Sequence, residues 1–378
     1  MKSANELLIT QLNERKASGL LRETKCVDDL IDFCSNDYLG LARNRELGEA
    51  MAKNYAAWLS QQPLETPING ATGSRLISGH SKLVDIFETQ CAAMHQAEAA
   101  LLFSSGYEAN VGLIAALAQK DHVIFCDKLL HASLIDGLRL SAAERRIFKH
   151  NDLGDLVHLL EQYPSTTTKW VVVESIYSMD GDQAPLAELI ALREKYQFEL
   201  IVDEAHAGGL YGSKGAGLGA AFPEIFARVV TFGKSWGNAG AVVLGSAILK
   251  QYLINFARPF IYSTAPTPEH VHHLLTAMPF VQQADEARIR LKNNIALFRR
   301  TINATSWGTS KTAIQTFFVS GNEAVRAAAK SAQDAGYAVK PIVYPTVPKG
   351  KERIRITLTS QTKESDIVGL IQTLESHA

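Results

Sequence analysis

The feature that most constrains the fold is an alternation of short apolar runs with helix-like stretches between about residues 95 and 250. The runs are rich in Val, Ile, Leu, Phe and Ala without strict alternation. They are Ala99–Phe103, His122–Cys126, Trp170–Glu174, Leu200–Asp203, Val229–Phe232 and Ala241–Leu244. Such runs are typical of strands buried on both faces. Repeated strand–turn–helix units predict an α/β fold with a mainly parallel central sheet covered by helices, and ligands in such sheets bind beyond the carboxyl ends of the strands.

The two ends of the chain follow a different pattern. Residues 2–21 and 284–302 predict amphipathic helices, and a final helix carries an apolar face over 367–374. The runs Ile314–Val319 and Arg353–Leu358 alternate as half-exposed strands do. We therefore predict three segments: an N-terminal helix and strand segment (1–40), a large domain (41–279) and a smaller α+β domain (280–378) that the N-terminal segment joins.

Composition excludes several classes of protein. The formal net charge of −1 gives no electrostatic reason to expect nucleic acid or an anionic membrane as partner. No apolar run approaches the roughly 20 residues of a membrane span, and residues 1–22 lack the apolar core of a signal peptide, so we expect a cytoplasmic protein. The four cysteines (Cys26, Cys34, Cys91, Cys126) lie far apart and predict neither a disulfide framework nor a metal site.

Two short motifs resemble those of ATPases, but their spacing and order do not fit an ATPase. Residues 203–206 spell D-E-A-H, and residues 233–235 spell G-K-S, the end of a phosphate-binding loop. A Walker loop needs a glycine five positions before its G-K pair, and Arg228 occupies that position. The acidic motif also precedes the supposed loop. The glycine-rich run Gly208–Gly219 lacks a helix opening directly after it and is interpreted as a loop rather than a dinucleotide site.

Charged and small residues at the strand ends match the needs of pyridoxal 5'-phosphate. That cofactor requires a lysine, a carboxylate for its pyridine nitrogen, a flat group against the ring and backbone N–H groups for its phosphate. Asp203 ends one apolar run and Lys234 follows another. The turn 104–107 (S-S-G-Y) joins a predicted strand to a helix N-terminus, which favours anions. His131 and His206 could contact the ring.

Each of these residues also has an ordinary structural explanation. The aspartate could bond a nearby backbone, the lysine could reach solvent, the serine turn could cap a helix, and each histidine could be a satisfied core residue. Their common placement at strand ends favours the cofactor interpretation.

The chain resembles the α-oxoamine synthases, which are fold-type-I pyridoxal-phosphate enzymes with the aspartate-aminotransferase-like PLP-dependent transferase fold. The resemblance runs over nearly the whole chain. It includes S-N-D-Y-L-G-L (35–41), G-A-T-G-S-R-L-I-S-G (70–79), S-S-G-Y-E-A-N (104–110), E-S-I-Y-S-M-D-G-D (174–182), D-E-A-H-A-G-G-L-Y-G (203–212), T-F-G-K (231–234) and P-T-V-P (345–348).

The resemblance implies a role for individual cofactor-site residues. Lys234 matches the imine-forming lysine, Asp203 the partner of the pyridine nitrogen, and His131 the histidine that stacks on the ring; these three are the predicted catalytic residues. The other predicted cofactor contacts are Gly106, Tyr107 and Thr231 near the phosphate, and Ser178 and His206 near the phenolic oxygen.

The resemblance also implies substrate and subunit contacts. Arg355 matches the arginine that binds the amino acid carboxylate, with Thr346 beside it, and Arg22 matches one associated with the acyl substrate. Family members are homodimers with the active site at the subunit interface, so that Ser263 and Thr264 would reach the neighbour's phosphate. No metal is implied.

The implied reaction is a decarboxylative condensation of an amino acid with an acyl thioester. Within the family the chain most resembles the branch in biotin biosynthesis that joins L-alanine to a pimeloyl thioester on coenzyme A or an acyl carrier protein. A sister synthase using glycine or serine with another acyl-CoA remains open. An aminotransferase-like or lyase-like relative and a non-catalytic protein on this fold are further alternatives, although Lys234 and Asp203 are both present.

Overall fold

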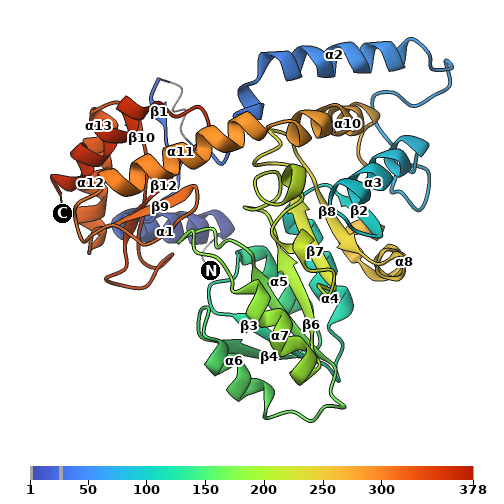
Figure 1. Cartoon of the computed structure of the whole chain (residues 1–378), viewed down its shortest axis with the longest axis horizontal. Helices are drawn as coiled ribbons and strands as arrows, with labels where there is room; N and C mark the ends of the chain where they lie inside the picture. Colours follow the sequence, from blue (N-terminus) through green and yellow to red (C-terminus); the bar gives the residue numbers. More distant parts are fainter. Residues whose placement is uncertain (1–2, 25–28, 378) are drawn as a thin grey trace.

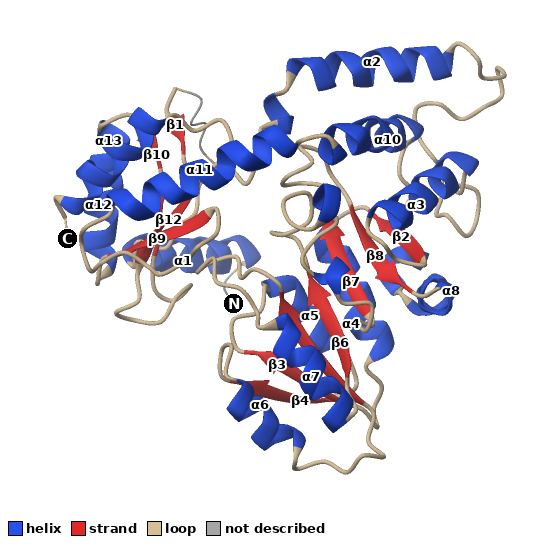
Figure 2. Cartoon of the chain, viewed as in Figure 1, coloured by secondary structure: helices blue, strands red, loops and turns tan. Residues whose placement is uncertain are grey.

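The computed structural model describes residues 3–24 and 29–377, so Cys26 lies outside the described residues. A seven-stranded sheet with helices on its faces forms the larger part of the molecule, and a smaller part holds the end of the chain (Figures 1 and 2). The long helix α11 (Asp285–Thr301) runs from one part to the other (Figure 1).

The large sheet has the strand order β2-β8-β7-β6-β5-β3-β4. Only β8 runs antiparallel to its neighbours β2 and β7, which confirms the predicted mainly parallel sheet. The strands are β2 (Ala99–Phe103), β3 (Val123–Asp127), β4 (Glu144–Phe148), β5 (Lys169–Glu174), β6 (Glu199–Asp203), β7 (Ala227–Thr231) and β8 (Ala241–Gly245).

Both faces of this sheet are covered, as the apolar runs predicted. Along β2, Ala100 and Leu102 belong to one apolar core, whereas Leu101 and Phe103 belong to the other. Successive side chains of a strand point to opposite faces, so two cores on one strand mean helices on both sides. The helices around the sheet are α3 (Lys82–Met94), α4 (Gly106–Leu117), α5 (Ala132–Leu140), α6 (Leu153–Leu160), α7 (Leu186–Tyr196), α8 (Ala247–Phe256), α9 (Arg258–Ile261) and α10 (Pro268–Gln282). The helix α2 (Arg45–Leu59) packs against α10 and lies away from the sheet (Figure 1).

The smaller part is built around a three-stranded antiparallel sheet of order β11-β12-β9. The strand β1, near the N-terminus, pairs with β10, and the carbonyl of Gly19 accepts a hydrogen bond from Arg326 of α12, so the two ends of the chain meet. The division at residues 40 and 279 stays a prediction. The elements are β1 (Ile31–Asp32), β9 (Ile314–Phe318), β10 (Tyr337–Ala338), β11 (Lys340–Ile342), β12 (Arg353–Thr357), α12 (Asn322–Asp334) and α13 (Glu364–Glu375).

The N-terminal helix α1 (Ala4–Ala17) forms inside the predicted range 2–21, and Ser3 caps it with a capping box. The prediction that this helix is amphipathic is wrong, because its apolar residues do not gather on one face. None of its side chains is buried, and its apolar residues Leu7, Leu8 and Leu12 are exposed. Within residues 3–24 and 29–377, no helix is long and apolar enough to cross a membrane.

Glu204 of the D-E-A-H motif and Arg228, before the G-K-S motif, form an ion pair inside the protein. Glu204, the second residue of D-E-A-H, accepts a hydrogen bond from Arg228 at 3.1 Å and another from the Gly219 backbone at 3.0 Å. Arg228 is the residue that breaks the Walker pattern, and it also donates to the carbonyls of His95 and Ala216. The Glu204 and Arg228 side chains are only 0% and 7% exposed, so this ion pair is part of the core.

We predict that Arg228→Ala lowers the free energy of unfolding by about 3–5 kcal/mol, because it leaves the Glu204 carboxylate buried without its cation. Chemical denaturation measures the change. Arg193→Ala serves as the control, because the Arg193–Glu199 pair has exposed fractions of 30% and 36% and contributes about 0–1 kcal/mol. Equal losses in the two variants would contradict the assignment of Arg228 to the core.

Candidate active site

The carboxyl ends of β5, β6 and β7 bring three ionisable side chains to one cavity. Glu174 ends β5, Asp203 ends β6 opposite it in register, and Lys234 lies three residues after the end of β7. All three line a cavity of about 440 Å³. His131, His206 and the turn before α4 line the same cavity, so the cluster predicted from strand ends is brought together.

The Asp203 carboxylate is held in place by two donors. One oxygen accepts the Ala205 backbone N–H at 2.8 Å, and the other accepts the side-chain amide of Asn110 at 2.7 Å. Asn110 is buried on α4 and also donates to Ser133 at 2.9 Å, which fixes its own orientation. Asp203 is 4% exposed. A carboxylate with two donors at a cavity wall can still accept a third N–H from a bound ring.

Lys234 carries an amine with an altered affinity for protons. Burial lowers its pKa, the carboxylates of Asp203 and Glu174 oppose this effect, and the cationic Arg355 adds to it. Within the described part of the chain, the Lys234 amine makes no hydrogen bond or ion pair. A partly buried amine with a lowered pKa is suited to react with a carbonyl group.

Glu174 is a second buried carboxyl group that the sequence analysis did not single out. It is 3% exposed, and one oxygen accepts the His131 backbone N–H at 2.5 Å. Burial raises its pKa well above the ordinary value, and the neighbouring Asp203 carboxylate raises it further. The signal was present in the sequence, because Glu174 ends a buried strand just as Asp203 does.

Each of the two histidines in the cavity has a hydroxyl within hydrogen-bond distance of its ring. His131 is the N-cap of α5, and its Nδ1 lies 2.8 Å from the Ser133 hydroxyl. Nδ1 of His206 lies 2.6 Å from the hydroxyl of the buried Tyr38. Burial lowers the pKa of both rings, and the nearby Lys234 and Arg355 cations lower that of His206 further. His206 is therefore a neutral imidazole with one donor and one acceptor.

The turn before α4 forms an anion cradle. Ser105 caps the helix by accepting the Glu108 N–H at 3.2 Å. The N–H groups of Gly106 and Tyr107 lie in the first turn, where the helix itself provides no acceptor for them. A Cβ added to Gly106 would lie 2.5 Å from Cγ2 of Thr231, so only glycine allows this approach of α4 to the end of β7. Helix N-termini of this kind bind phosphate groups.

These residues fit pyridoxal phosphate. The cavity is lined by the Lys234 amine, a carboxylate held by Asn110, the flat imidazole of His131 and an anion cradle, which are the four features that the cofactor requires. No group of three or more His, Cys, Asp and Glu among residues 3–24 and 29–377 is arranged to hold a metal ion.

Arg355 and Ser178 lie beside this cavity rather than on its wall. Arg355, on β12, donates from Nε to the Ser178 carbonyl at 2.6 Å and from Nη2 to Asn36 at 3.0 Å. Asn36 itself lines the cavity, and the Arg355 charge acts on both Lys234 and His206. Ser178 thus contributes its backbone to the arginine, and its predicted contact with a phenolic oxygen stays a prediction.

The remaining predicted residues lie elsewhere in the chain. Arg22 and Thr346 line a separate cavity of about 970 Å³ beside α12 and β11. Ser263 and Thr264 lie between α9 and α10, and Thr264 pairs with Ser74 in an isolated bridge. The structure therefore does not bring these four to the Lys234 cavity within one chain, and their roles stay predictions. Asn36 and Asn110 were missed because neutral amides carry no distinctive sequence signal.

Comparison with known proteins identifies the family. Residues 28–374 match the aminotransferase class I and II family. A protein of Geobacillus kaustophilus named putative 8-amino-7-oxononanoate synthase is 40% identical over 344 residues, covering 89% of this chain and 86% of the relative. The 8-amino-7-oxononanoate synthase of Haemophilus ducreyi is 38% identical over 356 residues, covering 91% of each chain.

Solved structures agree with the fold. A serine palmitoyltransferase of Sphingomonas wittichii superposes with a TM-score of 0.87 at 26% identity, covering 99% of this chain and 97% of the other. The 8-amino-7-oxononanoate synthase of Francisella tularensis superposes with a TM-score of 0.75 at 27% identity, covering 92% and 98%. These matches confirm the PLP-dependent transferase fold, and this chain belongs to the aminotransferase class I and II family and, within it, to the 8-amino-7-oxononanoate synthases.

Proposed function

We propose that this chain joins L-alanine to a pimeloyl thioester and releases 8-amino-7-oxononanoate, carbon dioxide and a free thiol, with pyridoxal 5'-phosphate bound through Lys234. The observation that carries the proposal is the convergence of Lys234, Asp203, His131 and the N-terminus of α4 on one cavity. The relatives at 38–40% identity over 89–91% of the chain carry the name of that synthase.

Pyridoxal phosphate supplies an electron sink that stabilises negative charge at the α-carbon of an amino acid. Asp203 would accept a hydrogen bond from the pyridine nitrogen, and its two fixed donors keep the carboxylate in place for that contact. His131 would lie against the ring. The N–H groups of Gly106 and Tyr107 would bind the phosphate.

Side chains of this protein would bind the substrate and transfer the protons. Arg355 would bind the alanine carboxylate, because its planar guanidinium suits two oxygens at once. Burial lowers the pKa of Lys234, which makes its neutral amine available to accept the α-proton. The α-carbon then bonds to the acyl carbon while the carbon–sulfur bond breaks and the thiol leaves. Loss of the carboxyl group as carbon dioxide leaves a carbon that Lys234 can reprotonate.

A homodimer is the assembly that we propose. Ser263 and Thr264 lie outside the Lys234 cavity of their own chain, and the exposed apolar residues of α1 leave a surface that a second chain could cover. The thioester carrier is coenzyme A or an acyl carrier protein.

A second candidate is a serine-using sister synthase. The serine palmitoyltransferase of Sphingomonas wittichii has the higher TM-score (0.87 against 0.75), whereas the named 8-amino-7-oxononanoate synthases have the higher sequence identity. We give greater weight to the identity, because substrate choice depends on side chains, whereas the TM-score reports how the backbone is arranged.

We predict that borohydride reduction of the cofactor-loaded protein attaches the cofactor to the peptide that contains Lys234. Lys234→Ala should lose this attachment and all turnover, because Lys234 is the one lysine at the cavity wall among residues 3–24 and 29–377. Peptide mass mapping reads the result. Lys195→Ala changes an exposed lysine of α7 and should behave as the wild type does. Attachment at another lysine would refute the assignment.

We also predict that thiol release is fastest with alanine and a pimeloyl thioester. The measurement pairs alanine, glycine and serine with pimeloyl and palmitoyl thioesters on coenzyme A and on acyl carrier protein. Faster release with serine and palmitoyl-CoA would replace the proposed reaction with that of the sister synthase. No release in any pairing would overturn the condensation itself.

A further inference from the structure

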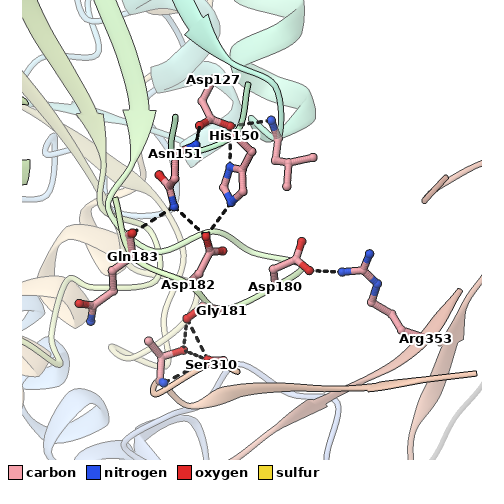
Figure 3. A network of polar contacts seen from close by, with 11 residues as sticks. Asp127, His150, Asn151, Asp180, Gly181, Asp182, Gln183, Ser310 and Arg353 are labelled. Atoms are coloured by element: carbon pink, nitrogen blue, oxygen red, sulfur yellow. Dashed lines mark hydrogen bonds and ion pairs between the residues drawn. The ribbon is translucent and has the colours of Figure 1, made fainter. Parts of the chain in front are cut away.

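The loop of residues 175–183 joins β5 to α7 and is held from both sides. It begins directly after Glu174 and folds back on itself, with an isolated bridge between Ile176 and Gln183. Figure 3 shows contacts from this loop to the large sheet on one side and to the smaller part of the molecule on the other. The residues that make these contacts have no role in the cofactor binding described above.

His150 attaches the loop to the large sheet (Figure 3). Its Nδ1 lies 2.8 Å from Asp127 at the end of β3, and its Nε2 lies 2.6 Å from Asp182 of the loop. Asp127 is completely buried, and its other oxygen accepts the Asn151 backbone N–H at 2.8 Å. The Asn151 side chain donates to Asp182 at 2.7 Å, so two consecutive residues hold the same loop carboxylate.

This arrangement requires a charged imidazole. A neutral ring has one N–H, whereas a carboxylate oxygen lies within hydrogen-bond distance of each of the two ring nitrogens here. Burial lowers the pKa of His150, but the hydrogen bonds to Asp127 and Asp182 outweigh it and raise the pKa to about 10. The edge of the ring also meets Tyr177 of the loop, with ring centroids 4.4 Å apart at 90°.

The opposite side of the loop contacts the smaller part of the molecule. The Gly181 carbonyl accepts hydrogen bonds from the hydroxyls of Ser310 at 2.9 Å and Thr312 at 2.8 Å. Asp180 forms an ion pair with Arg353 of β12. Gly181 has a φ of +72°, and a Cβ there would lie 2.4 Å from the Ile314 carbonyl oxygen, so the loop packs too closely for any side chain at this position.

The same loop also holds Arg355, two residues beyond Arg353 on β12. Nε of Arg355 donates to the Ser178 carbonyl at 2.6 Å, Nη1 to Thr357 at 2.9 Å and Nη2 to Asn36 at 3.0 Å. A guanidinium has five N–H donors, so these three contacts leave one N–H on each Nη, and the Tyr38 hydroxyl also lies close to the guanidinium. The direction of these two donors is set by the acceptors that the other three engage.

We infer that His150 is a positioning residue for amino acid binding: it fixes the 175–183 loop between Asp127 and Asp182, and the loop in turn aims the free donors of Arg355 at the substrate carboxylate. The inference rests on the proposed function in taking Arg355 as the carboxylate-binding group. None of the contacts made by His150 reaches the anion cradle at Gly106 or the amine of Lys234, so we expect the main effect to fall on the amino acid.

The test compares His150→Asn with His158→Asn, an exposed histidine on α6, in the cofactor-loaded protein. Absorbance titration measures the dissociation constant of L-alanine, and thiol release measures kcat and both KM values. We expect His150→Asn to raise the alanine dissociation constant and KM about tenfold, the effect of one charge-assisted hydrogen bond. Cofactor affinity, kcat and thioester KM should stay within about twofold of the wild type. His158→Asn should match the wild type throughout.

A second variant keeps the test decisive if His150→Asn does not fold. Asp180→Asn breaks the contact with Arg353 at the other side of the loop without touching His150, and it should raise the alanine dissociation constant in the same direction. In the wild type, nitrogen-15 NMR at pH 8 should show protons on both ring nitrogens of His150. An alanine dissociation constant unchanged in the folded variants, an equal rise in thioester KM, or a singly protonated ring would each overturn the inference.

The outcome separates this inference from the proposed reaction. A wild type that binds alanine but releases no thiol refutes the condensation, while the dissociation constants still decide the role of His150. A wild type that binds no amino acid removes the carboxylate-binding role of Arg355 and refutes the inference as well.

Discussion

Two buried carboxyl groups side by side at the ends of adjacent strands are the constraint on which the rest of the site depends. Glu174 and Asp203 face each other in register at the carboxyl ends of β5 and β6. Two charges this close and this deep cannot both be tolerated without partners. Asp203 is held by the donors of Asn110 and Ala205, whereas Glu174 accepts the His131 N–H and holds its proton more strongly. Burying both carboxyl groups lowers the stability of the fold. It also places the Asp203 carboxylate, in a fixed orientation, in the same cavity as the Lys234 amine.

The same strand end connects the cofactor cavity to the smaller part of the molecule. The 175–183 loop leaves β5 immediately after Glu174, and Arg355 donates to its backbone only four residues later, at Ser178. The residue that accepts the His131 N–H and the residue whose carbonyl accepts from Arg355, the proposed carboxylate-binding group, therefore belong to one short segment. Glu174 is held by the sheet itself, whereas the contacts of His150 with Asp127 and Asp182 hold the loop that follows it (Figure 3).

The sequence predicted the parts of the fold in which apolar residues follow a recognisable pattern. The strands β2 and β7 are buried on both faces and appear as apolar runs, whereas β4 (E-R-R-I-F) was missed because it lies at the sheet edge with polar side chains exposed. Lys234 and Asp203 could be found because charge at the end of an apolar run is unusual. His150 could not, because its function arises from Asp127 and Asp182, which lie 23 and 32 residues away in sequence.

A crystal structure of the chain grown with pyridoxal phosphate tests the central claim most directly. We predict a ring joined to the Lys234 amine, with its nitrogen within hydrogen-bond distance of the Asp203 carboxylate and its phosphate at the N–H groups of Gly106 and Tyr107. A ring bound outside this cavity, or one attached to Lys234 with its nitrogen directed away from Asp203, would contradict it.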